Sequence, residues 1–314
     1  MRKLTGRILC TALIAGILTG AAALSAKADA VPSDVGNEDT KYERYISFGA
    51  DLKPAEKNSV LNIFGLTEKS LADYKTIEVT NKDEHDYLDA YLDSSVIGTR
   101  ALSSVMIVKT EEGSGITVST NNINYCTSGM YCNALVTAGM SDAKVTVAAP
   151  FNISGTSALV GAMKAYSVMT GQDISETTMD TATDELVTTA EVAESIGDNE
   201  KVVQLVAAAK QKIFEEELSS ESDIKDAVES SAEALKIDIK QEDIDKLTAM
   251  LKKVSEVDID VDAIKEQASE IYNKLKDAGI DFSQVDTKGL AEKVGDFFAN
   301  IFNAIKDFFS GLFG

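Results

Sequence analysis

This chain of 314 residues contains few of the residues that build common catalytic and metal sites: one histidine, three cysteines, three prolines and no tryptophan. The single histidine, His85, excludes a zinc site made of several histidines. Three cysteines are too few for a disulfide scaffold, and a chain of this length does not need one. The sequence also lacks the Gly-x-Ser-x-Gly, Walker and Rossmann patterns. We therefore predict no catalytic residue, no metal ion and no cofactor.

Basic residues are also scarce, with 30 lysines and arginines against 51 aspartates and glutamates, for a formal net charge of −21. A surface of this charge repels phosphate backbones and anionic lipid headgroups, so we exclude nucleic acid as a partner bound through basic patches. Residues 172–314 hold 33 acidic and 15 basic residues, whereas residues 31–171 hold 17 and 11. The negative charge is therefore mainly a property of the C-terminal half.

Residues 1–28 have the three parts of a secretory signal peptide. Basic residues stand within the first seven positions, residues 8–24 form an uncharged apolar run, and small residues follow at the spacing that a signal peptidase reads. Cleavage would leave Asp29 or Val31 as the new N-terminus. The alternative is an uncleaved membrane anchor, but the apolar run is short for a span of ~20 residues. We predict a protein that is secreted or held at the extracellular face of the cell envelope.

The chain from residue 29 to residue 171 divides into a polar leader (29–43) and a region where strand and helix signals alternate (44–171). The glycines of residues 113–115 predict a β-hairpin between two of the strands. This order predicts a single mixed sheet covered by helices. The predicted strands are 45–48, 76–79, 101–109, 116–120 and 144–149, and the predicted helices are 54–64, one that starts at 81, 129–138 and 156–170.

After residue 171 the strand signals end, and residues 172–286 form an acidic helical region. Apolar residues recur there at helical spacing, as in Ile244, Leu247 and Leu251. The fold class that we predict is α+β, with an N-terminal mixed α/β sheet domain followed by an acidic all-helical region. The predicted helices are roughly 181–195, 199–217, 222–234, 242–254, 262–277 and 288–312.

Ser154, Gly155, Thr156 and Ser157 lie between a predicted strand and a predicted helix. Backbone N–H groups and hydroxyls would converge at this junction, which is a geometry that binds anions. Ordinary helix capping uses the same residue types and is the simpler interpretation. We predict that a ligand pocket in the N-terminal half, where one exists, lies at these four residues.

The only histidine lies within an acidic cluster, residues 83–86, on a helix that Thr80 and Asp83 cap in a variant of the capping box. Neighbouring carboxylates could make His85 a base or a metal ligand. A surface histidine on a capped helix is the simpler interpretation.

Two cysteines, Cys126 and Cys132, stand on either side of a predicted helix start at Thr127 or Ser128. A short local disulfide and two free, half-buried thiols are both compatible with this spacing. The sequence leaves the choice between them open.

Residues 287–314 form an amphipathic, phenylalanine-rich helix. Three occupants of its apolar face are possible: the protein's own core, a membrane interface, and a partner such as an envelope protein or a second copy of the chain. The scarcity of basic residues weakens the membrane alternative, and the density of phenylalanine strengthens it. The predicted interaction residues are Phe297, Phe298, Ile301, Phe302, Ile305, Phe308, Phe309 and Leu312.

The sequence resembles a family of secreted bacterial proteins catalogued as domain of unknown function 1002. The matching stretches are FGADL (48–52), VTNKDEHDYL (79–88), IGTRALSSVMI (97–107), MYCNALVTAGMSDAKVTVAAPFNISGTSALVGAMKAY (130–166) and VDIDVDAIKEQASEIYNKL (257–275). The resemblance implies an exported protein of a Gram-positive-type bacterium, with both halves of the chain in one family. It implies no activity. Cys126 and Cys132 depart from the family's usual pattern, which lowers any catalytic role for them.

Two functional hypotheses follow. The first is an exported, envelope-associated or secreted binding protein without catalysis, because the sequence lacks a nucleophile–base or metal constellation and ends in an apolar helix. The alternative is an extracellular enzyme that acts on cell-wall or other polymers, with residues 154–157 and 83–86 in one site. The enzyme hypothesis requires that these two segments share a cleft within ~15 Å.

Overall fold

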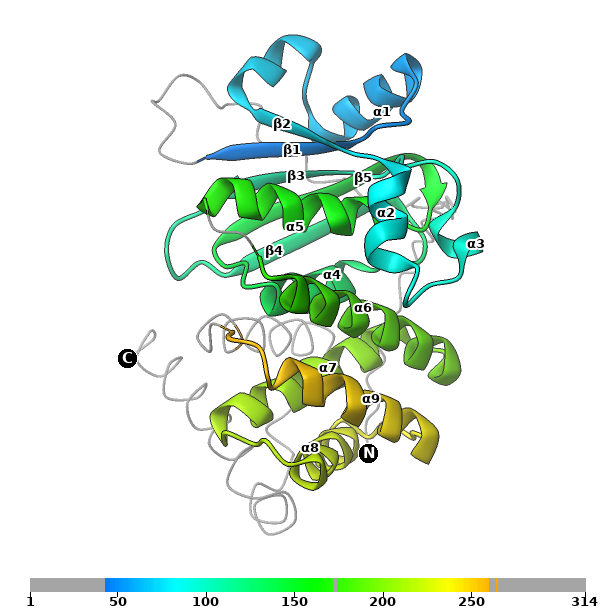
Figure 1. Cartoon of the computed structure of the whole chain (residues 1–314), viewed down its shortest axis with the longest axis vertical. Helices are drawn as coiled ribbons and strands as arrows, with labels where there is room; N and C mark the ends of the chain where they lie inside the picture. The colour runs from blue at the N-terminus through cyan, green and yellow to red at the C-terminus, as the bar shows by residue number, and fades with distance from the viewer. Residues whose placement is uncertain (1–42, 172–173, 260–263, 265–314) are drawn as a thin grey trace, which may run out of the picture. The chain divides into compact units, whose positions relative to one another are not determined.

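The computed structural model describes residues 43–171, 174–259 and 264 (Figure 1). The predicted signal peptide (1–28), the predicted leader except for its last residue, and the predicted C-terminal helix (287–314) lie outside these residues. Within them a five-stranded mixed sheet is followed by helices, which confirms the α+β prediction.

The strands are β1 (Arg44–Gly49), β2 (Lys75–Val79), β3 (Ser104–Lys109), β4 (Ile116–Ile123) and β5 (Ala143–Ile153). Among them stand α1 (Pro54–Phe64), the 3-10 helix η1 (Glu68–Asp73), α2 (Asn81–Leu88), α3 (Ser94–Ile97) and α4 (Ser128–Thr137). The chain continues with α5 (Thr156–Thr170), α6 (Glu176–Ile196), α7 (Asn199–Glu215), α8 (Glu221–Ala234) and α9 (Gln241–Val254).

The sheet has the strand order β2-β1-β3-β5-β4, so the hairpin predicted between the third and fourth strands is wrong. β5 lies between β3 and β4, antiparallel to the first and parallel to the second. The burial of the strands explains this order. β5 is buried along most of residues 143–149, as suits an inner strand, whereas β4 is buried only at Ile116 and is otherwise half-buried or exposed, as suits an edge. The glycines at 113 and 115 adopt positive φ in the connection that carries the chain past β5.

Helices cover both faces of the sheet. Ile46 and Phe48 of β1 pack against one another and against α1 on one face, whereas Tyr45 belongs to the core on the opposite face. α5 lies on that opposite face against β1, β2 and β3, as Figure 1 shows. The helix approaches β1 closely at Gly161, where an added Cβ would stand 2.4 Å from Ser47 Oγ.

One continuous core runs from the sheet through α4 into α6, α7, α8 and α9. Its most polar feature is a fully buried ion pair between Lys210 of α7 and Glu185 of α6, both 0% exposed. Lys210 Nζ lies 2.7 Å from Glu185 Oε1, and it also donates to Thr137 Oγ1 and to the Asn133 carbonyl of α4, each at 2.8 Å. Thr137 donates to the other oxygen of the Glu185 carboxylate. This cluster ties the sheet half to the helical half.

Local signals placed several helix ends correctly. α1 begins with Pro54 and ends at Gly65, which adopts a φ of 71°. Thr80 caps α2 in a capping box with Asp83, and Thr127 caps α4. Cys126 and Cys132 do not form a disulfide with each other, and both are buried, which resolves the choice that the sequence left open.

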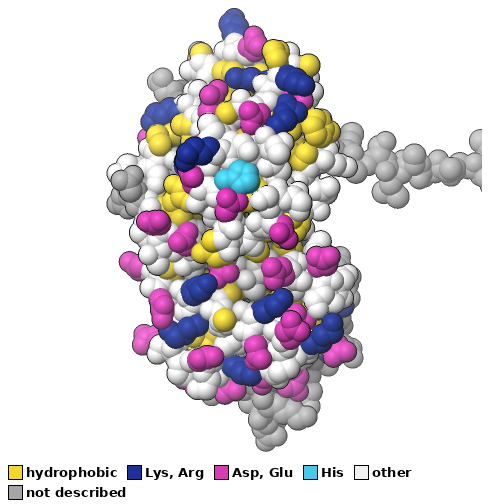
Figure 2. Space-filling view, turned by 45° about the vertical axis from the view of Figure 1, so that its right-hand side comes forward, with side chains coloured by type: hydrophobic (Ala, Val, Ile, Leu, Met, Phe, Trp, Pro, Cys, Tyr) yellow, Lys and Arg dark blue, Asp and Glu magenta, His cyan; other side chains and the backbone are white. Residues whose placement is uncertain are grey.

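Within the described ranges, every helix is too short or too polar to traverse a lipid bilayer. Acidic side chains are spread over the face shown in Figure 2, with lysines and arginines between them rather than gathered in one patch. This distribution gives that face no broad basic surface of the kind that binds a phosphate backbone.

Candidate functional site

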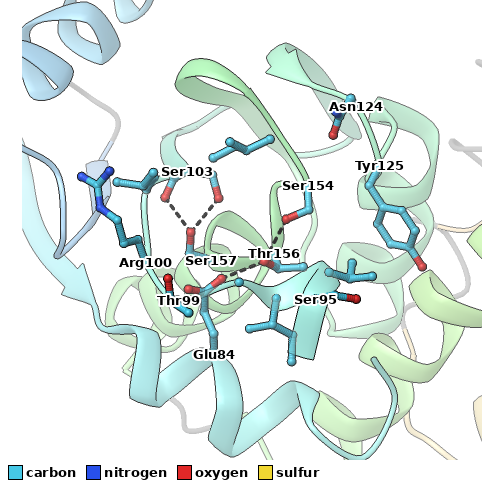
Figure 3. Close-up of a pocket in the computed structure, with 15 residues that line it drawn as sticks. Glu84, Ser95, Thr99, Arg100, Ser103, Asn124, Tyr125, Ser154, Thr156 and Ser157 are labelled. Carbon is cyan, nitrogen blue, oxygen red and sulfur yellow. Dashed lines mark hydrogen bonds between the residues drawn. The ribbon is translucent and has the colours of Figure 1, made fainter. Parts of the chain in front are cut away.

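A pocket of about 450 Å³ lies at the start of α5, where the ends of β4 and β5 meet α2 and the segment from α3 to β3 (Figure 3). Its volume falls in the range typical of small-molecule sites. Polar side chains line much of it. The serines and threonines of the lining are Ser95, Thr99, Ser103, Ser154, Thr156 and Ser157.

Three of the four residues predicted at a pocket, Ser154, Thr156 and Ser157, line it, whereas Gly155 does not. Gly155 instead shapes the turn into α5. Its φ is 100°, and an added Cβ would stand 2.6 Å from Tyr131 Oη and 2.8 Å from Ile123 Cγ2. Tyr131 Oη also donates to the Gly155 carbonyl at 2.5 Å. Only glycine fits here, because the conformation is left-handed and the space is filled.

The start of α5 is not capped in the ordinary way. Its N-cap is Gly155, which has no side chain to accept a hydrogen bond. The cap comes from the strand side of the pocket, since Ser103 Oγ accepts from the Ala158 N–H at 2.9 Å. Ser103 Oγ also lies 2.7 Å from Ser157 Oγ. The local capping interpretation is therefore wrong: Ser103, just before β3, supplies the cap.

Glu84 of α2 occupies the position at α5 where the sequence predicted an anion. Thr156 Oγ1 donates to Glu84 Oε1 at 2.7 Å, and Asn81 Nδ2 donates to Oε2 at 3.3 Å. The Glu84 side chain is 1% exposed. This burial raises the pKa of Glu84 to about 7, although the hydrogen bonds from Thr156 and Asn81 oppose the shift. The carboxyl can therefore gain or lose a proton near neutral pH.

The other members of the acidic cluster have partners outside the pocket. Burial disfavours the charged form of Asp83, but hydrogen bonds from Lys164 and Thr80 outweigh it and lower the pKa of Asp83 to about 2. His85 Nδ1 lies 2.6 Å from Asp89 Oδ1, a contact that raises the pKa of the histidine. Of residues 83–86, only Glu84 lines the pocket.

Arg100 also lines the pocket, but its charge is already compensated. Its Nη2 lies 2.7 Å from Glu56 Oε2 and donates to the Asp51 carbonyl at 2.8 Å. Figure 3 shows the guanidinium directed away from Glu84. Arg100 therefore holds the wall of the pocket in place rather than offering a free positive charge.

Sequence reasoning missed most of this wall, which consists of residues 95–100, Leu102 and Ser103 together with Asn124 and Tyr125. Residues 95–100 show no clear periodicity, and Gly98, with a φ of 81°, is the one local sign of a special turn there. Tyr125 is half-buried, and its burial raises its pKa to about 12. These residues meet α5 only through the tertiary fold.

The arrangement suits hydrogen bonding better than nucleophilic chemistry. The pocket lining includes no histidine, cysteine or lysine among the described residues, so Glu84 is the only available base. Ser154 Oγ lies 3.3 Å from Thr156 Oγ1, which in turn reaches Glu84. The described part of the chain also holds no group of three or more histidine, cysteine or acidic residues placed to bind a metal ion.

Comparisons with known proteins give a family but no chemistry. A family model described as "Protein of unknown function (DUF1002)" matches residues 48–271. The chain is similar to "Uncharacterized protein YpuA" of Bacillus subtilis (strain 168), with 38% identity over 266 residues that cover 84% of this chain and 89% of that protein. No solved structure matches the chain significantly. The chemistry of the site must therefore be argued from its geometry.

Proposed function

We propose that this chain, which belongs to the DUF1002 family of proteins of unknown function, is an exported binding protein that holds a small polar ligand in the pocket at the start of α5. The observation that carries the proposal is the pocket itself. Side chains from four separate stretches, around residues 84, 95–103, 124–125 and 153–157, converge on about 450 Å³. Hydroxyls and a carboxyl around a concave volume are the groups that orient a small polar molecule.

An extracellular enzyme is the second candidate, because the two segments that it requires do meet. Thr156 Oγ1 lies 2.7 Å from Glu84 Oε1, and a carboxyl with a pKa of about 7 is suited to general acid–base work. Hydrolysis of a glycan polymer usually takes a pair of carboxyls across the scissile bond. Glu84 is the one carboxyl side chain in the pocket lining that the structure describes, so binding is the better supported function.

Two neighbouring serines provide a matched test of ligand binding. Ser95 lines the pocket, whereas Ser94 does not, and both are exposed at the start of α3. We expect small polar ligands to shift the threonine methyl NMR signals of Thr99 and Thr156. Ser95→Phe should abolish these shifts by filling the pocket, and Ser94→Phe should leave them intact. A ligand library that moves neither methyl group, or that moves them equally in both variants, would contradict the proposal.

Export and envelope attachment rest on segments outside the described residues, and cell fractionation tests both. We expect the protein outside the cytoplasm, with an N-terminus at Asp29 or Val31 by N-terminal sequencing. Removing residues 297–314 should transfer it from the envelope fraction to the medium, because the deletion removes most of the apolar face. The intact chain and a cytoplasmic marker serve as controls. Identical partitioning of the truncated and intact chains would rule out attachment through this segment.

A further inference from the structure

The two most deeply buried glutamates of the described chain differ in how their charge is compensated. Glu185, at 0% exposure, is paired with Lys210 at 2.7 Å. Glu84, at 1% exposure, has hydrogen bonds from Thr156 and Asn81 but no ion pair within the described residues. Burying a carboxylate without an opposite charge is costly. Glu84 also differs in its location, because it lines a pocket.

Among the described residues, no cation near Glu84 is free to pair with it. Arg100 is held by Glu56, Lys164 lies 2.6 Å from Asp83, and His85 lies against Asp89. Each of these cations is already paired with a carboxylate. The carboxylate has about four lone-pair sites and the two hydrogen bonds use part of them, so it retains acceptor capacity. Because the described residues offer no unpaired cation, a charge that compensates ionised Glu84 would come from a molecule that enters the pocket.

We propose that the ligand of this pocket carries a primary ammonium group that pairs with Glu84; this inference rests on the proposed binding function. An ammonium offers three N–H donors, and hydroxyl oxygens beside the carboxylate can accept them: Thr156 Oγ1 lies 2.7 Å from Glu84 Oε1, and Ser154 Oγ lies 3.3 Å from Thr156 Oγ1. A divalent cation is a poorer fit, because Ca²⁺ requires six to eight oxygen ligands and Mg²⁺ near-ideal octahedral coordination, and the pocket supplies one carboxylate. An anion is disfavoured, because the Glu84 carboxyl already stands at the start of α5.

The pairing predicts how binding depends on pH. The ammonium requires an ionised Glu84, and burial raises the pKa of that carboxyl to about 7. Affinity should therefore rise as the pH increases to about 7, by about tenfold per unit, and then level off until the amine loses its own proton. A neutral ligand that accepts a hydrogen bond from protonated Glu84 would show the opposite trend. The titratable and charged groups around Glu84 and in the pocket lining are Asp51, His85, Arg100, Tyr125, Cys126 and Tyr131.

Matched pairs of an amine and its N-acetyl derivative test the proposal directly. The probes are glucosamine with N-acetylglucosamine, and ethanolamine with N-acetylethanolamine, titrated into the purified protein between pH 5 and pH 8 with the threonine methyl signals as readout. We expect the amines to bind at least about tenfold more tightly than their acetylated forms. Glu84→Gln should remove this preference and its pH dependence. Asp86→Asn and His85→Gln, on the same helix, should retain both.

The outcomes separate this inference from the proposed function. Equal or tighter binding of the N-acetyl forms, or affinity that falls between pH 5 and pH 7, would overturn the ammonium pairing and leave the binding function standing. If neither the four probes nor a wider set of polar ligands shifts the methyl signal of Thr99 or Thr156, both the ammonium pairing and the binding function are overturned. Should Glu84→Gln fail to fold, the pH trend of the unmodified protein and of His85→Gln decides the question.

Discussion

Replacing Lys210 with methionine is expected to lower the free energy of unfolding by about 3–5 kcal/mol, because the substitution leaves a buried carboxylate without its counter-charge. Glu185 is 0% exposed and would keep only the hydrogen bond from Thr137. The Asn133 carbonyl would lose the donor that now lies 2.8 Å away. Urea denaturation followed by far-UV circular dichroism measures the change.

Two further variants identify the cause of this loss. Lys201→Met removes an exposed lysine of the same helix, whose partner Asp198 lies 3.4 Å away at the surface, and should change stability by less than about 1 kcal/mol. Lys210→Met combined with Glu185→Leu removes both buried charges and should recover most of the stability. If the single Lys210 variant costs no more than the Lys201 variant, the buried pair does not hold the two halves together.

Glu84→Gln is expected to change how stability depends on pH. The pKa of Glu84 is about 7 in the folded chain, against an ordinary value of 4.5, so the folded state holds its proton more tightly than the unfolded state. The stabilisation from the protonated carboxyl is complete below pH 4.5 and is lost as the pH rises through 7. Between pH 4 and pH 8 this loss amounts to about 3 kcal/mol. Glutamine does not titrate, so the variant should lack this component.

The measurement is the difference in unfolding free energy between the variant and the unmodified protein at each pH, which cancels the groups that titrate in both. The difference should shift in favour of Glu84→Gln as the pH rises. Asp86→Asn serves as the control, because Asp86 lies on the same helix and pairs with Lys82 at the surface. Parallel profiles for Glu84→Gln and the unmodified protein would show that folding does not raise the pKa of the Glu84 carboxyl.

Much of the local structure follows from short-range rules, and strand pairing does not. Pro54, Gly65 and the Thr80–Asp83 box mark helix ends because their effects act within a few residues. The hairpin prediction failed because glycines between two strands are compatible with a tight turn and with a longer connection. The burial of β5 on both faces decided between them, and burial depends on residues far apart in the chain.

Only the part of the candidate site at the junction of β5 and α5 could be predicted from the sequence. Residues 154–157 could be singled out because a strand ends and a helix starts there. The importance of Glu84 could not be predicted, because it depends on a contact with Thr156, which lies 72 residues away in the sequence. The buried pair did leave a signal: Lys210 stands four residues after Val206 and three before Ile213, both buried, and so on the apolar face of α7. A lysine at such a position calls for a buried acid, but the sequence does not say which one.

The buried lysine also constrains the order in which the chain can reach its native state. Asn133 and Lys210 are separated by 77 residues, so α4 cannot complete its contacts until α6 and most of α7 are available. Long sequence separation between partners slows folding, because a large loop must close before the contact forms. During synthesis, which starts at the N-terminus, the sheet half would lack the contacts of α4 with α6 and α7 until those helices are made. The sheet half is therefore poorly suited to an independent existence, and shortening the chain within α7 would affect residues far upstream of the cut.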